Sequence, residues 1–165
     1  MKNILFYLIV MAGFSCNQST SNLALQKKID SLQSEINNSY KPGLGEFMSQ
    51  IQVHHAKLWF AGKNENWQLA NFEVGEIQEA LDDIPKYCAD RPEVKSINMI
   101  DPAMDSLSIA IKEKNENKFS SGFTLLTATC NDCHKATNHG FNVIKIPDTP
   151  PFSNQVFKPA LGKNK

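Results

Sequence analysis

A Cys-x-x-Cys-His pentad at residues 130–134 constrains this chain of 165 residues more than any other feature. The two cysteines lie about one helical turn apart, so both thiols can add to the two vinyl groups of one porphyrin. His134 follows them directly and is then held beneath the iron as an axial ligand. The pentad therefore predicts one covalent haem c, attached through Cys130 and Cys133, with His134 as the proximal iron ligand.

A Cys-x-x-Cys pair also occurs in redox dithiols and as half of a zinc site. The chain has no second Cys-x-x-Cys pair, and no strand-rich, thioredoxin-like pattern surrounds the first one. The alternative that the pentad occurs by chance in a protein without haem stays open.

The first 15 residues have the layout of a secretory signal peptide. Lys2 precedes an apolar run over residues 4–12, which is too short to span a bilayer as a stable helix. The small Ser15 before Cys16 resembles the cleavage site of bacterial lipoproteins. That resemblance implies an acylated Cys16 and an exported, membrane-anchored protein facing the periplasm or the cell surface. An ordinary signal peptide and an uncut anchor are the alternatives.

The charge balance argues against a nucleic-acid partner, and the cysteine count leaves one thiol without an assigned role. Lys and Arg number 17 and Asp and Glu also number 17, so the sequence offers neither a basic patch for nucleic acid nor an acidic tail. Haem takes two of the four cysteines and the lipid a third. Cys88 is left alone, and we interpret it as a small half-buried residue near a helix end rather than a reactive thiol.

Apolar residues recur at helical spacing along most of the chain and predict an all-α fold. The predicted helices cover residues 25–36, 43–61, 66–84, 101–114 and 117–138. The first is a short amphipathic helix or stalk after a linker over 17–24, and Lys41-Pro42-Gly43 ends it. The other four, with short to moderate connections, predict an antiparallel four-helix bundle. Residues 85–98 and the proline-rich tail are expected to be irregular and extended, respectively.

Four regions follow from these patterns. They are a signal peptide (1–15), an anchor linker with the amphipathic helix (16–42), a haem-binding helical bundle (43–140) and an extended C-terminal tail (141–165). Five acidic residues of the helix over 66–84 lie off its apolar stripe, so we expect a solvated face rather than a carboxylate metal site. They are Glu73, Glu76, Glu79, Asp82 and Asp83.

A haem pentad near the end of the fourth helix of a bundle resembles the cytochrome c prime family. The resemblance covers about residues 43–140 and rests on the pentad with its apolar approach, Phe119 and Phe123. It implies that the first bundle helix supplies the residue over the distal face of the haem. Small globular cytochromes c differ, because they need a methionine after the pentad. The last methionine here is Met104.

The sixth iron position has several candidates. In an antiparallel pair of helices Met48 lies at about the level of His134 and can be the distal ligand, although core packing is its ordinary role. His55 or His54 are alternatives, of which only one can face inward, and an open or water-bound site is another. His139 lies too near the end of its own helix to cross the haem, so we expect it at the surface.

These features predict a monohaem electron carrier rather than an enzyme. A haem-based gas-binding or gas-sensing protein with an open distal site is one alternative, and a partner-binding structural lipoprotein is another. A peroxidase would need a distal His–Arg pair, and Arg91, the single arginine, lies in a predicted irregular segment. The expected partners are unnamed redox proteins and the membrane, with a homodimer left open.

Overall fold

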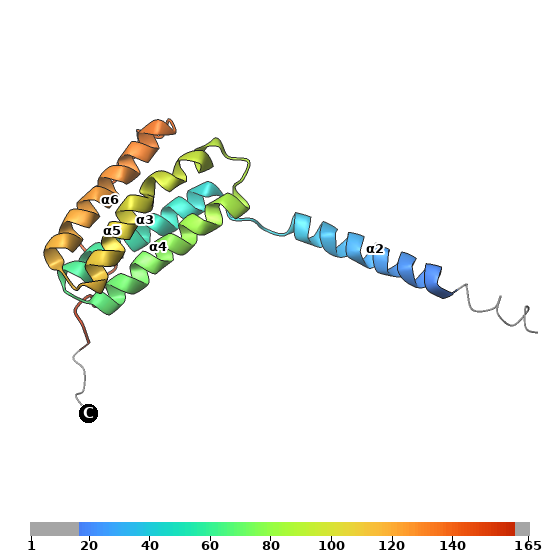
Figure 1. The fold of residues 1–165 in the computed structure, drawn as a ribbon, viewed down its shortest axis with the longest axis horizontal. Helices are drawn as coiled ribbons and strands as arrows, with labels where there is room; N and C mark the ends of the chain where they lie inside the picture. The colour runs from blue at the N-terminus through green and yellow to red at the C-terminus, as the bar shows by residue number, and fades with distance from the viewer. Residues whose placement is uncertain (1–16, 161–165) are drawn as a thin grey trace, which may run out of the picture. The chain divides into compact units, whose positions relative to one another are not determined.

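The computed structural model of the chain describes residues 17–160 (Figure 1). Its elements are α2 (Asn17–Asn38), α3 (Leu44–Lys63), α4 (Trp67–Tyr87), the 3-10 helix η2 (Pro92–Ile100), α5 (Asp101–Lys112) and α6 (Glu116–Ala136). The described residues contain no strand, so the predicted all-α class is confirmed. Within the same range, no helix is both long enough and apolar enough to cross a membrane.

Backbone contacts divide the chain into two units, residues 1–41 and 42–165, and each is described by itself. In the first unit the described element is α2, which begins at Asn17, so the prediction of a linker over 17–24 is wrong. Residues 17–38 contain no Gly or Pro, and Asn, Ser and Thr reduce helix stability by at most about 0.7 kcal/mol each. Side-chain pairs such as Gln26–Asp30, 2.8 Å apart, support the helix further.

Local hydrogen bonds set the starts of α3 and α4. The Glu46 carboxylate accepts the Gly43 N–H at 3.0 Å, which satisfies a donor at the start of α3. Glu65 turns the chain with a positive φ of 55°, and the Asn66 side chain then accepts the Leu69 N–H at 3.2 Å. The turn and cap separate α3 from α4 by three residues and bring the two helices back together.

Three predicted boundaries need correction. The fourth helix is capped by Asn115, whose side chain accepts the Lys118 N–H at 3.0 Å, and not by Asn117. The segment expected to be irregular forms η2 over residues 92–100 and runs directly into α5, so Asp101 is helical rather than a cap. Helix α4 continues through Pro85 to Tyr87, because a proline in the last turn costs few of the helix's hydrogen bonds.

Each of α3, α4, α5 and α6 packs against two of the others: α3 on α4, α4 on α5, α5 on α6 and α6 on α3. In Figure 1 these four helices lie together, with the η2 segment leading into α5. The side chains between them are mostly apolar, and the largest fully buried ones are Phe119, Phe123, Leu58, Ile77, Ile84, Leu107 and Leu126. Deleting such a side chain typically costs 2–5 kcal/mol, roughly, so this core supplies much of the unit's stability.

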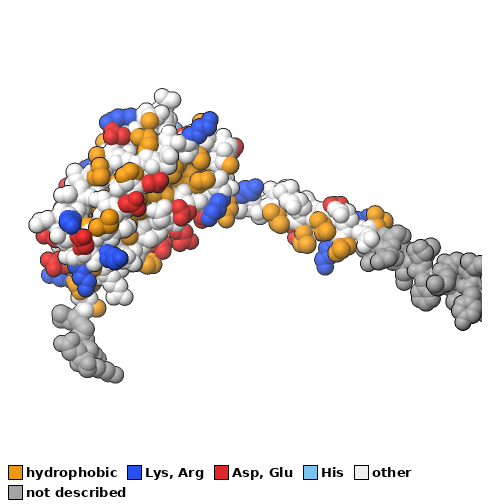
Figure 2. All heavy atoms as spheres, viewed as in Figure 1, with side chains coloured by type: hydrophobic (Ala, Val, Ile, Leu, Met, Phe, Trp, Pro, Cys, Tyr) orange, Lys and Arg blue, Asp and Glu red, His pale blue; other side chains and the backbone are white. Residues whose placement is uncertain are grey.

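The residues after α6 form no helix up to residue 160, as predicted for the tail. Phe157 is buried and its ring lies 5.6 Å from that of Phe60. The Asn66 side chain donates to the Phe157 carbonyl at 3.1 Å. The tail therefore returns along the helices to the α3–α4 turn. On the face of the molecule seen in Figure 2, acidic and basic side chains are interspersed without a field of one sign.

Gly62 of α3 lies against the ring of Phe119 of α6. A Cβ atom built on Gly62 would fall 2.1 Å from two ring atoms of Phe119. Phe119 is fully buried and also faces the rings of Trp59 and Trp67. The ring therefore has little room to move away, and the absence of a side chain at position 62 permits the close approach of the two helices.

We expect Gly62→Ala to destabilise the protein by roughly 1–3 kcal/mol, because the new methyl group overpacks the Phe119 ring. Gly75→Ala is the matched control, since Gly75 also lies within a helix and a Cβ there meets nothing within 4 Å. That control should be stabilising by up to about 1 kcal/mol. Guanidinium chloride unfolding of both variants measures the difference. Equal stabilities would contradict the packing described here.

Candidate cofactor site

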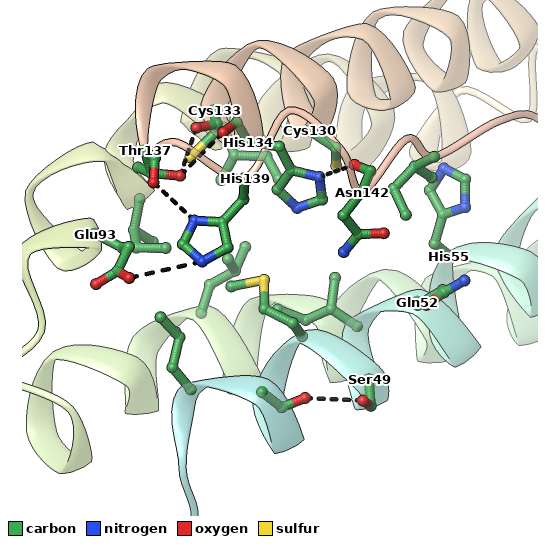
Figure 3. A pocket seen from close by; sticks show the side chains of 18 of the residues that line it. Ser49, Gln52, His55, Glu93, Cys130, Cys133, His134, Thr137, His139 and Asn142 are labelled. Atoms are coloured by element: carbon green, nitrogen blue, oxygen red, sulfur yellow. Dashed lines mark hydrogen bonds and ion pairs between the residues drawn. The ribbon is translucent and has the colours of Figure 1, made fainter.

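A cavity of about 320 Å³ opens between α3, α6, the η2 region and the chain that follows α6. Its size falls in the range of ligand sites, about 300–1,000 Å³. The pentad residues Cys130, Cys133 and His134 all line it (Figure 3). The apolar part of its wall is formed by Leu44, Met48, Ile51, Leu81, Ile97, Ile100 and Ile144.

The two cysteines lie on the inner side of the last turns of α6. Burial, with a smaller contribution from Cys133, raises the pKa of the Cys130 thiol to about 12. Burial also raises the pKa of the Cys133 thiol, whose Sγ lies 3.6 Å from the Ser96 carbonyl oxygen. Redox-active cysteine pairs depend on a lowered thiol pKa, whereas burial raises the pKa of both thiols here, so a redox dithiol is disfavoured.

His134 is held by a backbone group. Its Nδ1 lies 2.6 Å from the carbonyl oxygen of Asn142, a contact drawn in Figure 3. A carbonyl oxygen can only accept, so Nδ1 carries the proton and donates it, and the lone pair of the neutral ring lies on Nε2. Metal-binding histidines typically have their second nitrogen tied in this way, which fixes ring orientation and raises ligand basicity.

The opposite wall of the cavity is the face of α3 that carries Gly45, Met48, Ser49, Gln52 and His55. Helices α3 and α6 run in opposite directions: Gly62 meets Phe119, and His55, seven residues earlier, meets Thr127, eight residues later. Both helices rise about 1.5 Å per residue, so the same register places His134 level with Met48 and Ser49. Met48 is partly buried against the core at this level.

His55 lies about two turns deeper, at the end of the cavity away from His139 (Figure 3). Its Nε2 is 2.9 Å from Thr127 Oγ1, and that hydroxyl donates its own proton to the Phe123 carbonyl at 2.9 Å. Nε2 of His55 must therefore be the protonated nitrogen that donates to Thr127. The ring also lies 4.4 Å from that of Phe123. In this state Nε2 has no lone pair for iron, so His55 could ligate a metal only through Nδ1.

Burial lowers the pKa of His55 from 6.5 to about 4. The unfolded chain therefore binds a proton at this residue near pH 6.5, whereas the folded protein does so only near pH 4. Stability due to the neutral ring is complete above pH 6.5 and is lost as the pH falls from 6.5 to about 4. This shift of the His55 pKa corresponds to about 3 kcal/mol of unfolding free energy.

We expect His55→Gln to flatten this loss of stability, since glutamine does not titrate and keeps an amide donor for Thr127. Guanidinium chloride unfolding of the parent and the variant at pH 7, 5.5 and 4 measures it. The parent should lose about 3 kcal/mol more than the variant between the two extremes. Parallel stability curves for the two proteins would contradict the buried neutral state of His55.

The structure does not bring His54 to the cavity. Its Nδ1 lies 2.6 Å from a carboxylate oxygen of Glu73, and Lys57 Nζ lies 3.1 Å from the other oxygen. Glu73 is fully buried, so the prediction that it lies on a solvated face is wrong. That prediction treated the apolar stripe of α4 as its single buried face. In the structure α4 packs against both α3 and α5, and Glu73 faces α3. A buried carboxylate at that interface requires partners, which His54 and Lys57 provide.

A polar group lies at the other end of the cavity. Arg91 donates to both carboxylate oxygens of Glu93, at 2.8 and 3.2 Å, and this pairing lowers the pKa of Glu93. His139 lines the cavity near them, with Nδ1 2.7 Å from the Thr137 carbonyl and Nε2 3.9 Å from Glu93. The side chain of His139 is 40% exposed, so its surface position agrees with expectation, but its presence in the cavity wall does not follow from the sequence.

The residues present fit a covalently attached haem. Two protonated thiols and one imidazole with a free Nε2 share one wall of a largely apolar cavity, which is the donor set that haem c requires. The described residues contain no group of three or more His, Cys, Asp or Glu placed to hold a bare metal ion. The fit therefore rests on the pentad and the cavity rather than on a cluster of metal ligands.

Two predicted cysteine roles lie away from this site. Cys16, the predicted lipid acceptor, is outside the described residues. Cys88 follows the last turn of α4, is buried, and points its Sγ at the Pro42 carbonyl oxygen at 3.7 Å. Its place near a helix end agrees with the prediction, but the side chain is buried rather than half-buried.

The sequence did not reveal the groups that surround the pentad histidine. The Asn142 carbonyl is a backbone atom and leaves no trace in a residue pattern. Gln52 and Ser49 lie on the same helical face as Met48, so the spacing of that face could have identified them. Comparisons of the chain with protein-family models, with curated proteins and with solved structures found no match.

Proposed function

We propose that this chain is a c-type monohaem cytochrome that transfers single electrons. The observation that carries the proposal is the shared cavity wall of Cys130, Cys133 and His134, with His134 Nδ1 donating to a backbone carbonyl and Nε2 free. When bound, haem would supply a one-electron iron couple. The thiols of Cys130 and Cys133 would hold the porphyrin by thioether bonds, and His134 Nε2 would donate to the iron.

The chain's other residues would keep the iron site in one geometry. The apolar side chains of the cavity would exclude water from a bound porphyrin, and the Asn142 carbonyl keeps the His134 ring from rotating. A ring held in one orientation limits what would have to reorganise on reduction, which electron transfer requires. We also propose that α3, α4, α5 and α6 form an antiparallel four-helix bundle similar to that of the cytochrome c prime family. The support is that each helix packs against two of the others, so that the contacts form a closed ring.

The first test is covalent attachment. The parent, matured in a bacterium with a c-type haem assembly system, should keep haem through a denaturing gel, as detected by peroxidase staining. A Cys130→Ala, Cys133→Ala double variant should lose all of the stain, because no thioether can form. Cys88→Ala is the matched control and should keep it. A parent without stain, or a double variant with full stain, would defeat the proposal.

The sixth iron position separates an electron carrier from a gas-binding protein. Met48 lies on the wall opposite the pentad and level with His134, so we propose its thioether as the distal ligand. The gas-binding alternative has its own support: the same wall carries Ser49 and Gln52, whose polar groups suit a bound diatomic ligand.

If Met48 ligates the iron, the reduced parent should not bind carbon monoxide and Met48→Ala should. The substitution also removes a partly buried side chain, at a stability cost of roughly 2–5 kcal/mol. Absorption spectra of the reduced proteins with and without carbon monoxide measure the change. His55→Ala and His54→Ala are the parallel variants, and the spectral change in either would transfer the role to that histidine. Ready binding by the parent would favour the gas-binding function.

We also propose that the protein is exported and anchored to the membrane through lipid on Cys16, where a redox partner reaches it. Acyl chains contribute about 0.8 kcal/mol per buried CH₂. Cys16→Ser should therefore move the processed protein from the membrane fraction to the soluble fraction, as measured by immunoblotting. If the processed variant stays with the membrane, the lipid anchor on Cys16 is wrong. The alternative of a structural lipoprotein that binds other proteins would then also fail, because it needs the same lipid.

A further inference from the structure

The side chain of Asn131, between the two pentad cysteines, is tied to the segment that follows α6. Its Nδ2 donates to the Ile144 carbonyl and its Oδ1 accepts the Ile144 N–H, both at 2.8 Å. A third hydrogen bond, 3.1 Å long, joins Nδ2 to the Thr127 carbonyl within α6. The amide thus pairs with both backbone groups of Ile144 in the way that a neighbouring strand would, which holds that residue at a fixed distance and orientation.

Ile144 is two residues from Asn142, whose carbonyl receives the Nδ1 proton of His134. Two residues span at most about 7 Å, so fixing Ile144 restricts where the Asn142 carbonyl can lie. On the other side, the His139 N–H donates to the His134 carbonyl and the Asn142 N–H donates to the His139 carbonyl at 2.8 Å. The segment is therefore held at both ends, by the end of α6 and by Asn131.

Without Asn131 the attachment at the end of α6 would remain, together with the partly buried side chains of Ile144 and Ile146, of which Ile146 packs against the core. Apolar contacts are not directional, so they do not select the orientation of a peptide group as a pair of hydrogen bonds does. The attachment at the end of α6 follows Asn138, whose φ is 63°, and the tight turn there does not by itself set the direction of the chain beyond it. Asn142 and its neighbours Phe141 and Val143 are exposed, and the Phe141 ring lies 5.8 Å from that of His139, within the same turn, so this contact does not fix the chain beyond Asn142.

We propose that Asn131 is a positioning residue that fixes the tautomer and orientation of the His134 ring by holding the Asn142 carbonyl against Nδ1. The proposal deepens, and as regards iron rests on, the proposed haem function. The side chain of Asp132, the other residue between the cysteines, is 61% exposed, and within residues 17–160 its ion-pair partner is Lys135, at 3.2 Å. The two residues between the cysteines therefore have different roles: Asn131 positions the His134 ring, and Asp132 lies at the surface.

The test compares Asn131→Leu, which keeps size and helix propensity but removes the amide, with Asp132→Ala as the matched control. The first readout is hydrogen exchange in the ¹⁵N-labelled full chain. In the parent and the control, the Ile144 amide and the His134 Nδ1–H should both be protected. In Asn131→Leu, exchange of the Ile144 amide should rise at least about tenfold and the His134 ring signal should be lost to exchange with water.

The second readout is the reduction potential of the haem-loaded protein. Haem should remain attached in Asn131→Leu, since Cys130, Cys133 and His134 are unchanged. The potential should rise, because an imidazole without its carbonyl acceptor is a weaker donor and stabilises ferric iron less. If the leucine variant fails to fold, Asn131→Ala decides, because it removes the same hydrogen bonds with a smaller side chain and adds no charge. Its exchange rates and potential should change in the same direction as those expected for leucine.

Unchanged protection of the Ile144 amide in both Asn131 variants would overturn the proposal. So would faster exchange at Ile144 with an unchanged His134 ring signal and an unchanged potential, since Asn131 would then only anchor the tail. A parent chain that carries no covalent haem would instead overturn the proposed function, and the exchange measurements would still decide whether Asn131 positions the His134 ring.

Discussion

Phe119 lies in the space that Gly62 leaves in α3, and this contact determines how far α6 can slide along its neighbour. One side of the contact is backbone and the other is an aromatic ring enclosed by Trp59 and Trp67, so neither side can yield easily. Two turns further along, the His55–Thr127 hydrogen bond continues the same register. The cavity forms beyond that bond, where the two helices face each other without an aromatic side chain from α6 between them. The position of the pentad opposite Met48 is thus a consequence of packing at the far end of the helices.

Histidines in three environments show how the same side chain is used differently. His55 is buried and neutral, because burial lowers its pKa to about 4 and a threonine hydroxyl accepts its proton. His54, its neighbour in the sequence, faces α4 and shares the buried Glu73 carboxylate with Lys57. His134 is partly exposed and donates to a carbonyl, which leaves Nε2 available toward the cavity. Of the three, His134 lies on the wall that carries the two pentad cysteines, with Nδ1 tied to a carbonyl and the lone pair on Nε2.

The cavity has contributions from parts of the chain far apart in sequence. Helices α3 and α6 supply two walls, η2 and its preceding Arg91 supply a polar end, and residues 137–144 close the side next to His134. The last of these segments carries the Asn142 carbonyl and is held by Asn131. A cofactor attached to α6 would therefore be surrounded by groups whose positions depend on the whole unit.

The sequence alone determined the helical class, because apolar spacing at 3.6 residues per turn is a local property. It also predicted a joint role for Cys130, Cys133 and His134, because the chemistry of the pentad depends on adjacency in the chain. The level of Met48 relative to His134 was also within reach, since a regular rise per residue converts sequence distance into height. Only the tertiary structure decided which of His54 and His55 faces the cavity and that Glu73 is buried, because those depend on how α4 and α6 rotate against α3. It alone also placed the Asn142 carbonyl on His134 and the Asn131 amide on Ile144. These are contacts between a side chain and the backbone of a non-helical segment, and no residue pattern encodes the path of that segment in space.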